Sequence, residues 1–134
     1  MMIEFIVPGI PRSSQTKSTK SKSDWKSRVE AAARESLSVN DIIGENAFSA
    51  SIVYFYTGET ELDVDSIGKL LLDGLIGVLY NDDSQAEQVV LRKTQKDELT
   101  IKNPPAILVE ALDHHQNFVF VRLGDRPNHQ ELPL

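Results

Sequence analysis

Runs of apolar residues, bounded by proline, glycine or polar residues, predict the β-strands of this chain. The run at 47–56 is the richest in β-branched and aromatic side chains, which suit a pleated and partly buried surface. Residues 99–101 either extend the third strand or end it. The predicted strands cover residues 2–7, 47–56, 87–95, 106–112 and 118–123.

Two segments carry the period of about 3.6 residues that is typical of an amphipathic helix. The first runs from Trp25 to about Leu37, with Asp24 as its N-cap and Trp25 as its anchor in the core. The second runs from about Ser66 to Leu79, and its apolar residues cover most of its circumference, so it should be buried on several sides. Its glycines indicate either close backbone packing or a less regular helix.

Together these elements predict an α+β fold, with one mixed sheet of about four strands and two main helices packed on it. The length of 134 residues favours a single domain over 1–134. Residues 12–23 are rich in Ser, Thr and Lys, and we expect a mobile basic loop there. Residues 124–134 are expected to form a frayed tail.

Composition excludes several classes of protein. Apolar residues make up 40% and charged residues 25%, as in ordinary globular proteins, and no apolar run approaches the ~20 residues of a membrane helix. The N-terminus lacks the basic region of a secretory signal, so a cytoplasmic location is expected. Without cysteine the chain has no disulfide, thiolate zinc site or cysteine nucleophile. The sequence also lacks a glycine-rich phosphate loop, so no small-molecule cofactor is expected.

The charge is unevenly distributed. A net charge of −6 argues against nucleic-acid binding, but residues 1–34 carry seven cations against three anions, a local +4, so the remainder carries −10. This basic segment either binds phosphates or is a solvated loop. The candidate DNA-binding residues are Arg12, Lys17, Lys20, Lys22, Lys26 and Arg28.

The segment from Leu62 to Asp83 carries the candidate chemistry. Asp63 and Asp65 lie two apart, so in an extended chain their carboxylates share one side. Carboxylate oxygens suit Mg²⁺ or Mn²⁺, and a bound cation would relieve the repulsion between them. Asp65, Lys69 and Asp73 form a polar stripe, in which Lys69 either stabilises charge on a phosphate or forms an ion pair with one of the two aspartates.

A second acidic pair, Asp82 and Asp83, follows the predicted helix. A helix of ~14 residues spans about 21 Å, so these residues cannot approach Asp63 and Asp65 through helix geometry alone. We therefore expect the chain to fold back, so that the strand beginning near Glu87 lies beside the first pair.

Other interpretations of the aspartates are weaker. An EF-hand calcium loop requires oxygen ligands where Ile67 and Gly74 stand. A haloacid-dehalogenase-like phosphatase needs its aspartates directly after a strand, whereas a polar segment intervenes and the chain is short. Any single aspartate is explained by a turn or a cap, but the whole set is not. The histidines, His114, His115 and His129, are expected to be structural or surface residues.

The same segment resembles the RusA family of Holliday junction resolvases. That family carries a D-x-D-N-x-x-K-x-x-x-D stretch, matched here by Asp63, Asp65, Lys69 and Asp73, with Ser66 in place of the asparagine. The paired aspartates follow with one residue inserted. An early P-G-I-P-R-S-S resembles the family's proline-rich turn, and the resemblance covers roughly residues 3–112.

The resemblance implies a homodimeric, Mg²⁺-dependent endonuclease that hydrolyses phosphodiesters in branched DNA, above all four-way junctions. It implies metal binding by Asp63, Asp65 and one of the second pair, with Asp83 favoured over Asp82 by the spacing. Lys69 would assist the charged phosphate, and Asp73 would support Lys69 or contact metal. Two alternatives stay open: a catalytically inactive branched-DNA-binding module on the same fold, and a protein-interaction domain with an incidental acidic turn.

Overall fold

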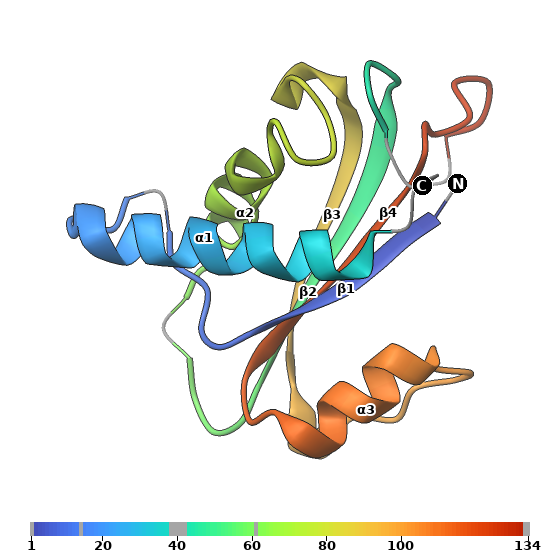
Figure 1. Cartoon of the computed structure of the whole chain (residues 1–134). Helices are drawn as coiled ribbons and strands as arrows, with labels where there is room; N and C mark the ends of the chain where they lie inside the picture. The colour runs from blue at the N-terminus through green and yellow to red at the C-terminus, as the bar shows by residue number, and fades with distance from the viewer. Residues whose placement is uncertain (1, 14, 38–42, 61, 133–134) are drawn as a thin grey trace.

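The computed structural model describes residues 2–13, 15–37, 43–60 and 62–132, and a four-stranded sheet forms its centre (Figure 1). The strand order is β1-β4-β2-β3. Strand β4 runs antiparallel to β1 and β2, whereas β2 and β3 are parallel, so the sheet is mixed, and the predicted α+β class is confirmed. The strands are β1 (Met2–Pro8), β2 (Phe48–Tyr56), β3 (Ala86–Gln95) and β4 (Phe118–Asp125).

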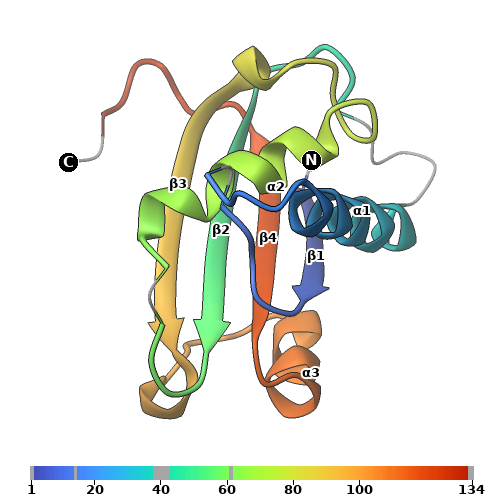
Figure 2. The same ribbon diagram turned by 90° about the vertical axis from the view of Figure 1, so that its left-hand side faces the viewer.

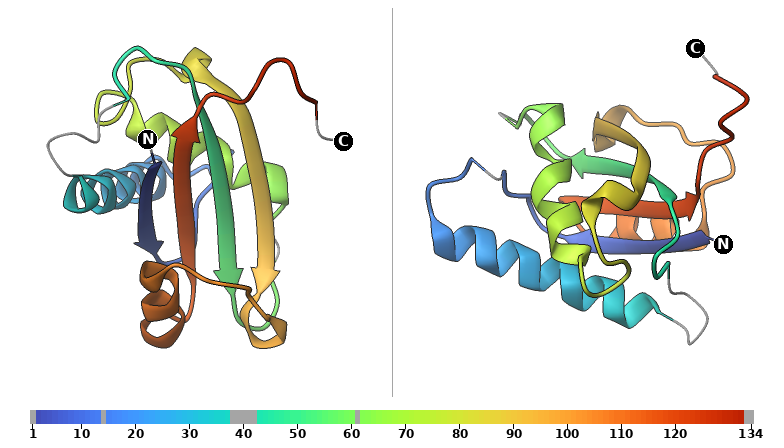
Figure 3. Two further views of the ribbon diagram at one scale, coloured as in Figure 1. Left: turned by 90° about the vertical axis from the view of Figure 1, so that its right-hand side faces the viewer. Right: turned by 90° about the horizontal axis from the view of Figure 1, so that it is seen from above.

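Helices cover the two faces of the sheet unequally. Helices α1 (Thr19–Ser36) and α2 (Gly68–Leu75) lie on one face, and α3 (Ala106–His114) lies on one end of the other face (Figures 2 and 3). The described part of the chain also holds three short 3₁₀ helices: η1 (Val64–Ser66), η2 (Asp83–Gln85) and η3 (Lys96–Glu98). Within the described ranges, no helix is both long and apolar enough to cross a membrane.

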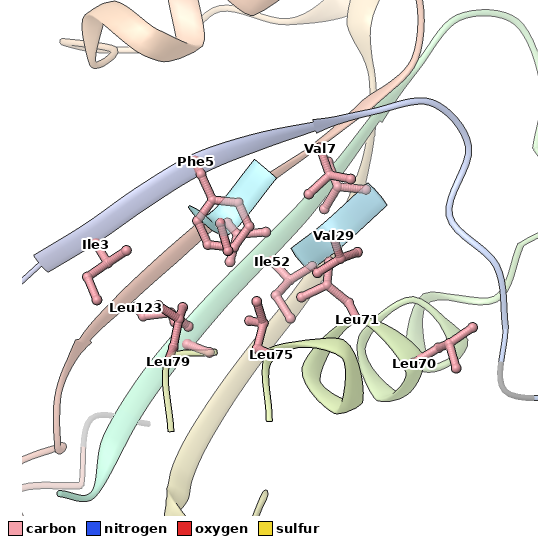
Figure 4. Packing of buried hydrophobic residues seen from close by; sticks show 14 of the residues in the cluster. Ile3, Phe5, Val7, Val29, Ile52, Leu70, Leu71, Leu75, Leu79 and Leu123 are labelled. Atoms are coloured by element: carbon pink, nitrogen blue, oxygen red, sulfur yellow. The ribbon is translucent and has the colours of Figure 1, made fainter. Parts of the chain in front are cut away.

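The main core lies between the sheet and the α1–α2 layer. Alternate residues of the strands point into it, and Leu71 and Leu75 of α2 lie near Ile52 of β2 (Figure 4). Trp25, as predicted, is buried with α1 against this core. A smaller apolar cluster joins α3 to the opposite face, where the rings of Phe55 and Phe118 stack with centroids 4.9 Å apart.

The first helix begins at Thr19 rather than Trp25, because its N-cap is Ser18 and not Asp24. The Ser18 side chain accepts a hydrogen bond from the Ser21 N–H (3.1 Å). The added turns carry no apolar stripe, so periodicity gives no sign of them. The prediction of a mobile loop over 12–23 is therefore wrong for its second half.

The second helix is shorter than predicted and ends at Leu75 instead of Leu79. Gly77 adopts φ +82°, a left-handed conformation that favours glycine, and its N–H donates to the Tyr80 carbonyl (2.7 Å). This turn reverses the chain, so η2 returns along α2 instead of lying a helix length away.

Two C-terminal predictions are wrong. Residues 106–112 form a helix, not a strand: Pro105 occupies the N-cap, and Leu108 and Ala111, one turn apart, are its buried residues. The frayed tail was predicted to begin at residue 124, but β4 continues to Asp125. Beyond it, Arg126 (2.9 Å) and His129 (2.8 Å) bind the Glu87 carboxylate. Residues 99–101 lie outside the strands.

Candidate active site

The first acidic pair lies on the loop between β2 and α2. Asp63 occupies the N-cap position of η1, where the backbone N–H (3.1 Å) and hydroxyl (2.8 Å) of Ser66 both donate to its carbonyl. Ser66, which replaces the asparagine of the family pattern, thus bonds locally. Asp65 lies within η1, so the prediction of an extended Asp63–Asp65 pair is wrong. Both side chains are exposed.

Strand β3 lies beside this loop, so this part of the predicted fold-back is confirmed. Lys93 Nζ donates to the Leu62 carbonyl (2.9 Å). At the start of α2, Gly68 approaches Leu91 so closely that an added Cβ would lie 2.7 Å from its Cδ2 atom. Figure 2 shows the first turn of α2 over β3. The contact falls on the second half of β3 and not at its start near Glu87.

Lys69 connects helix α2 with the turn that carries the second acidic pair. Its Nζ lies 3.1 Å from Asp73 Oδ1 and 3.4 Å from Asp83 Oδ2. The hydrogen bond to Asp73 is the largest cause that raises the pKa of Lys69, and the charge of Asp73 and the bond to Asp83 add to it. Lys69 is therefore a fixed cation and not a proton acceptor near neutral pH.

The two aspartates of the second pair have different partners. Asp82 Oδ2 accepts a hydrogen bond from the Ser84 hydroxyl (2.8 Å), which lowers the pKa of Asp82. Asp83 instead points its carboxylate toward Lys69, with its side chain 52% exposed. The geometry thus ties Asp82 to the local turn and leaves Asp83 at the site.

Two residues outside the predicted set hold this turn. Gln85 Oε1 accepts from the N–H groups of Asn81 and Asp82 (2.9 Å each). Buried Tyr80 donates its hydroxyl to the Leu72 carbonyl, and burial, with smaller effects of nearby carboxylates, raises its pKa. The spacing Asp82-x-x-Gln85 has the form of a capping box and would have revealed Gln85, whereas nothing in the sequence singles out Tyr80.

A comparison with known protein families identifies the family to which the chain belongs. The family model of endodeoxyribonuclease RusA matches residues 8–102, more than half of the chain and the whole acidic segment. The chain belongs to the RusA endodeoxyribonuclease family. A comparison with curated proteins finds no match. The family relationship makes the chain an endonuclease of DNA, and confirms the resemblance to Holliday junction resolvases.

The predicted DNA-binding cations of this RusA-family chain fall into separate groups. Lys22 and Lys26 of α1 line a groove against α2, together with Asp73. Arg28 turns away, since its Nη1 donates to the Pro8 carbonyl (3.1 Å), and it lines another hollow with Arg12. Lys20, in the first turn of α1, and Lys17, just before the helix, are both exposed. Lys22 and Lys26 lie beside Asp73, and Arg12 lies near the start of the acidic segment, where it lines a hollow with Leu62.

The donor types of the RusA-family site suit a hard divalent cation, because they are all carboxylate oxygens. The carboxylates of Asp63 and Asp65 are exposed and form no hydrogen bond or ion pair with other described residues. However, no three His, Asp or Glu side chains of the described ranges gather closely enough to hold an ion. Lys69 connects Asp73 and Asp83, and no ion-holding cluster unites Asp83 with Asp63 and Asp65.

Proposed function

We propose that this RusA-family protein is a Mg²⁺-dependent, structure-specific endonuclease that resolves Holliday junctions and other branched DNA in recombination and repair. The observation that supports this most is the position of Lys69 between Asp73 and Asp83, because it connects α2 with the turn that carries the second acidic pair. A phosphodiester placed there would meet the ammonium group of Lys69, and such cations stabilise the charge that develops on a phosphate during its hydrolysis.

Asp63, Asp65 and Asp83 are the proposed Mg²⁺ ligands, with Mn²⁺ as the other cation that the oxygen donors suit, and Asp82 supports the turn that presents Asp83. A bound Mg²⁺ supplies Lewis acidity and a water of lowered pKa. The exposed Asp63 and Asp65 side chains are unpaired within the described part of the chain, so they are available as ligands. Asp83 is held toward α2 by Lys69.

Lys69 is proposed to stabilise negative charge that builds on the phosphate oxygens during hydrolysis. Its raised pKa keeps the ammonium protonated, which this role needs. Asp73 acts as a positioning residue, since its carboxylate holds Lys69 Nζ from the next turn of the same helix.

The groove between α1 and α2 is the proposed path of DNA to the site. Lys22 and Lys26 lie along it and lead toward Asp73. Arg12 would contact the backbone near the loop that carries Asp63, and Lys17, Lys20 and Arg28 would contact it farther out. We further propose a homodimer, because two symmetric cuts in a four-way junction need two sites related by a two-fold axis. We also propose that the protein acts in the cytoplasm.

A synthetic four-way junction tests the proposal. Purified protein is mixed with the junction in Mg²⁺ or in chelator, and nicks and bound complexes are both measured. Paired nicks that require Mg²⁺ support the enzyme. Binding without cutting supports the alternative of an inactive branched-DNA-binding module on this fold, and the absence of both supports a protein-interaction domain.

A further inference from the structure

A basic hollow lies on the face of the sheet opposite α1 and α2. This face is covered by α3 only at one end (Figure 3). The hollow of about 400 Å³ lies between the strands, α3 and the loop that precedes α3. Three cations line it, Arg92 of β3, Lys102 of the loop and Arg122 of β4, and none of the described side chains that line it is acidic.

The strand register places two of these cations on one face. Val53 of β2 pairs with Arg92 on β3, so both side chains point to the same side of the sheet. Ser51, two residues before Val53, pairs with Arg122 on β4. The two arginines therefore flank β2 on its open face, and the pairing of β2 with β3 and with β4 fixes their separation.

The cations of the hollow differ in how far they are neutralised. Arg122 pairs with Glu4 (2.8 Å), and its guanidinium lies 5.6 Å from the centre of the Phe120 ring. Arg92 and Lys102 are exposed and form no ion pair with any described side chain. In a protein of net charge −6, two uncompensated cations around one hollow favour an anionic ligand.

We propose that this basic hollow, defined by Arg92, Lys102 and Arg122, binds the phosphate backbone of a DNA strand as a second contact away from the acidic loop. A guanidinium donates two parallel hydrogen bonds to a phosphate. Phe55 and Phe120, which are both buried, form the apolar base of the hollow beneath the cations.

The choice of DNA rests on the family's substrate and not on cutting by the acidic loop. A four-way junction sends arms in several directions from its centre, so a protein bound at the centre meets DNA on more than one face. An acidic protein segment is the competing ligand, because a guanidinium binds a carboxylate in the same two-bond geometry as a phosphate. The substrate of the family decides for DNA.

The test measures binding of a labelled four-way junction in chelator, where nothing is cut. Arg92→Ala with Lys102→Ala should weaken binding about tenfold, as expected when charge-assisted hydrogen bonds are lost. The slope of log affinity against log salt should fall by about 0.9 for each phosphate contact removed. The matched control is Arg34→Ala, which removes an exposed cation of α1 that pairs with Glu30 (2.9 Å).

An affinity and a salt slope equal to those of Arg34→Ala would overturn the proposal and leave the hollow to an acidic protein partner. Arg92→Lys with intact Lys102 keeps both charges and should retain more affinity than the double variant. Cutting in Mg²⁺ at saturating junction should match wild type. If the wild-type protein binds junctions without cutting, the proposed nuclease fails while the hollow is still tested.

Discussion

Lys69 Nζ lies 3.4 Å from Asp83 Oδ2, although the two residues are fourteen positions apart. The contact exists because α2 ends at Leu75 and the turn at Gly77 sends the chain back along the helix. The start of α2 and the start of η2 therefore meet at one ammonium group, and this group is where substitutions should be most informative.

Lys69→Met should lower the rate of junction cutting at saturating DNA by about 10²–10³-fold, as expected when a group that stabilises transition-state charge is removed. Binding in chelator should change little, because one cation among many is lost. The melting temperature should also change little, because exposed ion pairs add little to stability. Single-turnover cutting and fluorescence anisotropy measure the two effects.

The control for Lys69→Met is Arg34→Met, which also breaks an exposed i,i+4 ion pair and removes one positive charge. It should cut junctions at the wild-type rate. Equal losses in the two variants would show that general charge, and not the position of Lys69, determines activity.

Asp65→Asn should abolish cutting but preserve or tighten junction binding. The amide keeps the size of the side chain and removes a negative charge close to the DNA, which weakens a divalent-cation ligand and also reduces repulsion of phosphate. Asp113→Asn, an exposed site on α3, removes the same charge elsewhere and should leave both properties unchanged. Undiminished cutting by Asp65→Asn would contradict the assigned site.

Strands were predicted well because their signal is local. Alternation of buried residues along β1 and the long apolar run of β2 are visible in sequence, and both strands lie where expected. The segment at 106–112 is also apolar, but a short apolar run does not reveal its period reliably. Only the prolines before Ala106 and the one-turn spacing of Leu108 and Ala111 distinguish this helix from a strand.

The acidic site could be predicted only in part. The sequence identifies Asp63, Asp65, Lys69 and Asp83 as candidates through the family pattern. It does not reveal that Lys69 reaches Asp83, because that contact depends on where α2 stops and on the φ of Gly77. The hydrophobic period continues to Leu79 and so hides the end of α2 at Leu75, because Leu79 and Tyr80, which follow the turn, are buried as well.

The packing of α2 on β3 predicts opposite effects of two glycine substitutions. Gly74→Ala places its Cβ at 3.5 Å from Lys26, an ordinary contact, so the gain in helix propensity should stabilise the protein by about 1 kcal/mol. Gly68→Ala places its Cβ at 2.7 Å from Leu91, and the overlap should cost about 1–3 kcal/mol. Urea unfolding measures both.

A second substitution separates crowding from helix propensity. Leu91→Ala removes the side chain that Gly68→Ala would overlap, so the penalty of Gly68→Ala should largely disappear in that background. Because the same contact holds the acidic loop against β3, Gly68→Ala should also slow cutting more than Gly74→Ala does. Equal stability of the two alanine variants would show that Leu91 moves aside freely.

Burial of Tyr80 predicts a specific loss of stability in alkaline solution. Its pKa is raised chiefly by burial and also by the charges of Asp73 and Asp83, so the phenol stays protonated in the folded protein after it ionises in the unfolded chain. Below about pH 10, the ordinary tyrosine pKa, both states hold the proton and the group gives no pH dependence. Above it the unfolded state releases more protons, and the free energy of unfolding falls as pH rises.

Tyr80→Phe tests this directly. At neutral pH the variant should be about 1 kcal/mol less stable, because the hydrogen bond to the Leu72 carbonyl is lost. Between pH 9 and 11, roughly the range around the ordinary tyrosine pKa, its free energy of unfolding should fall less steeply than that of wild type. Urea unfolding at each pH gives both curves, and the difference between them removes the contribution of Lys69 and other shared groups. Parallel curves would mean that Tyr80 ionises equally in both states and that its hydroxyl is not held by the fold.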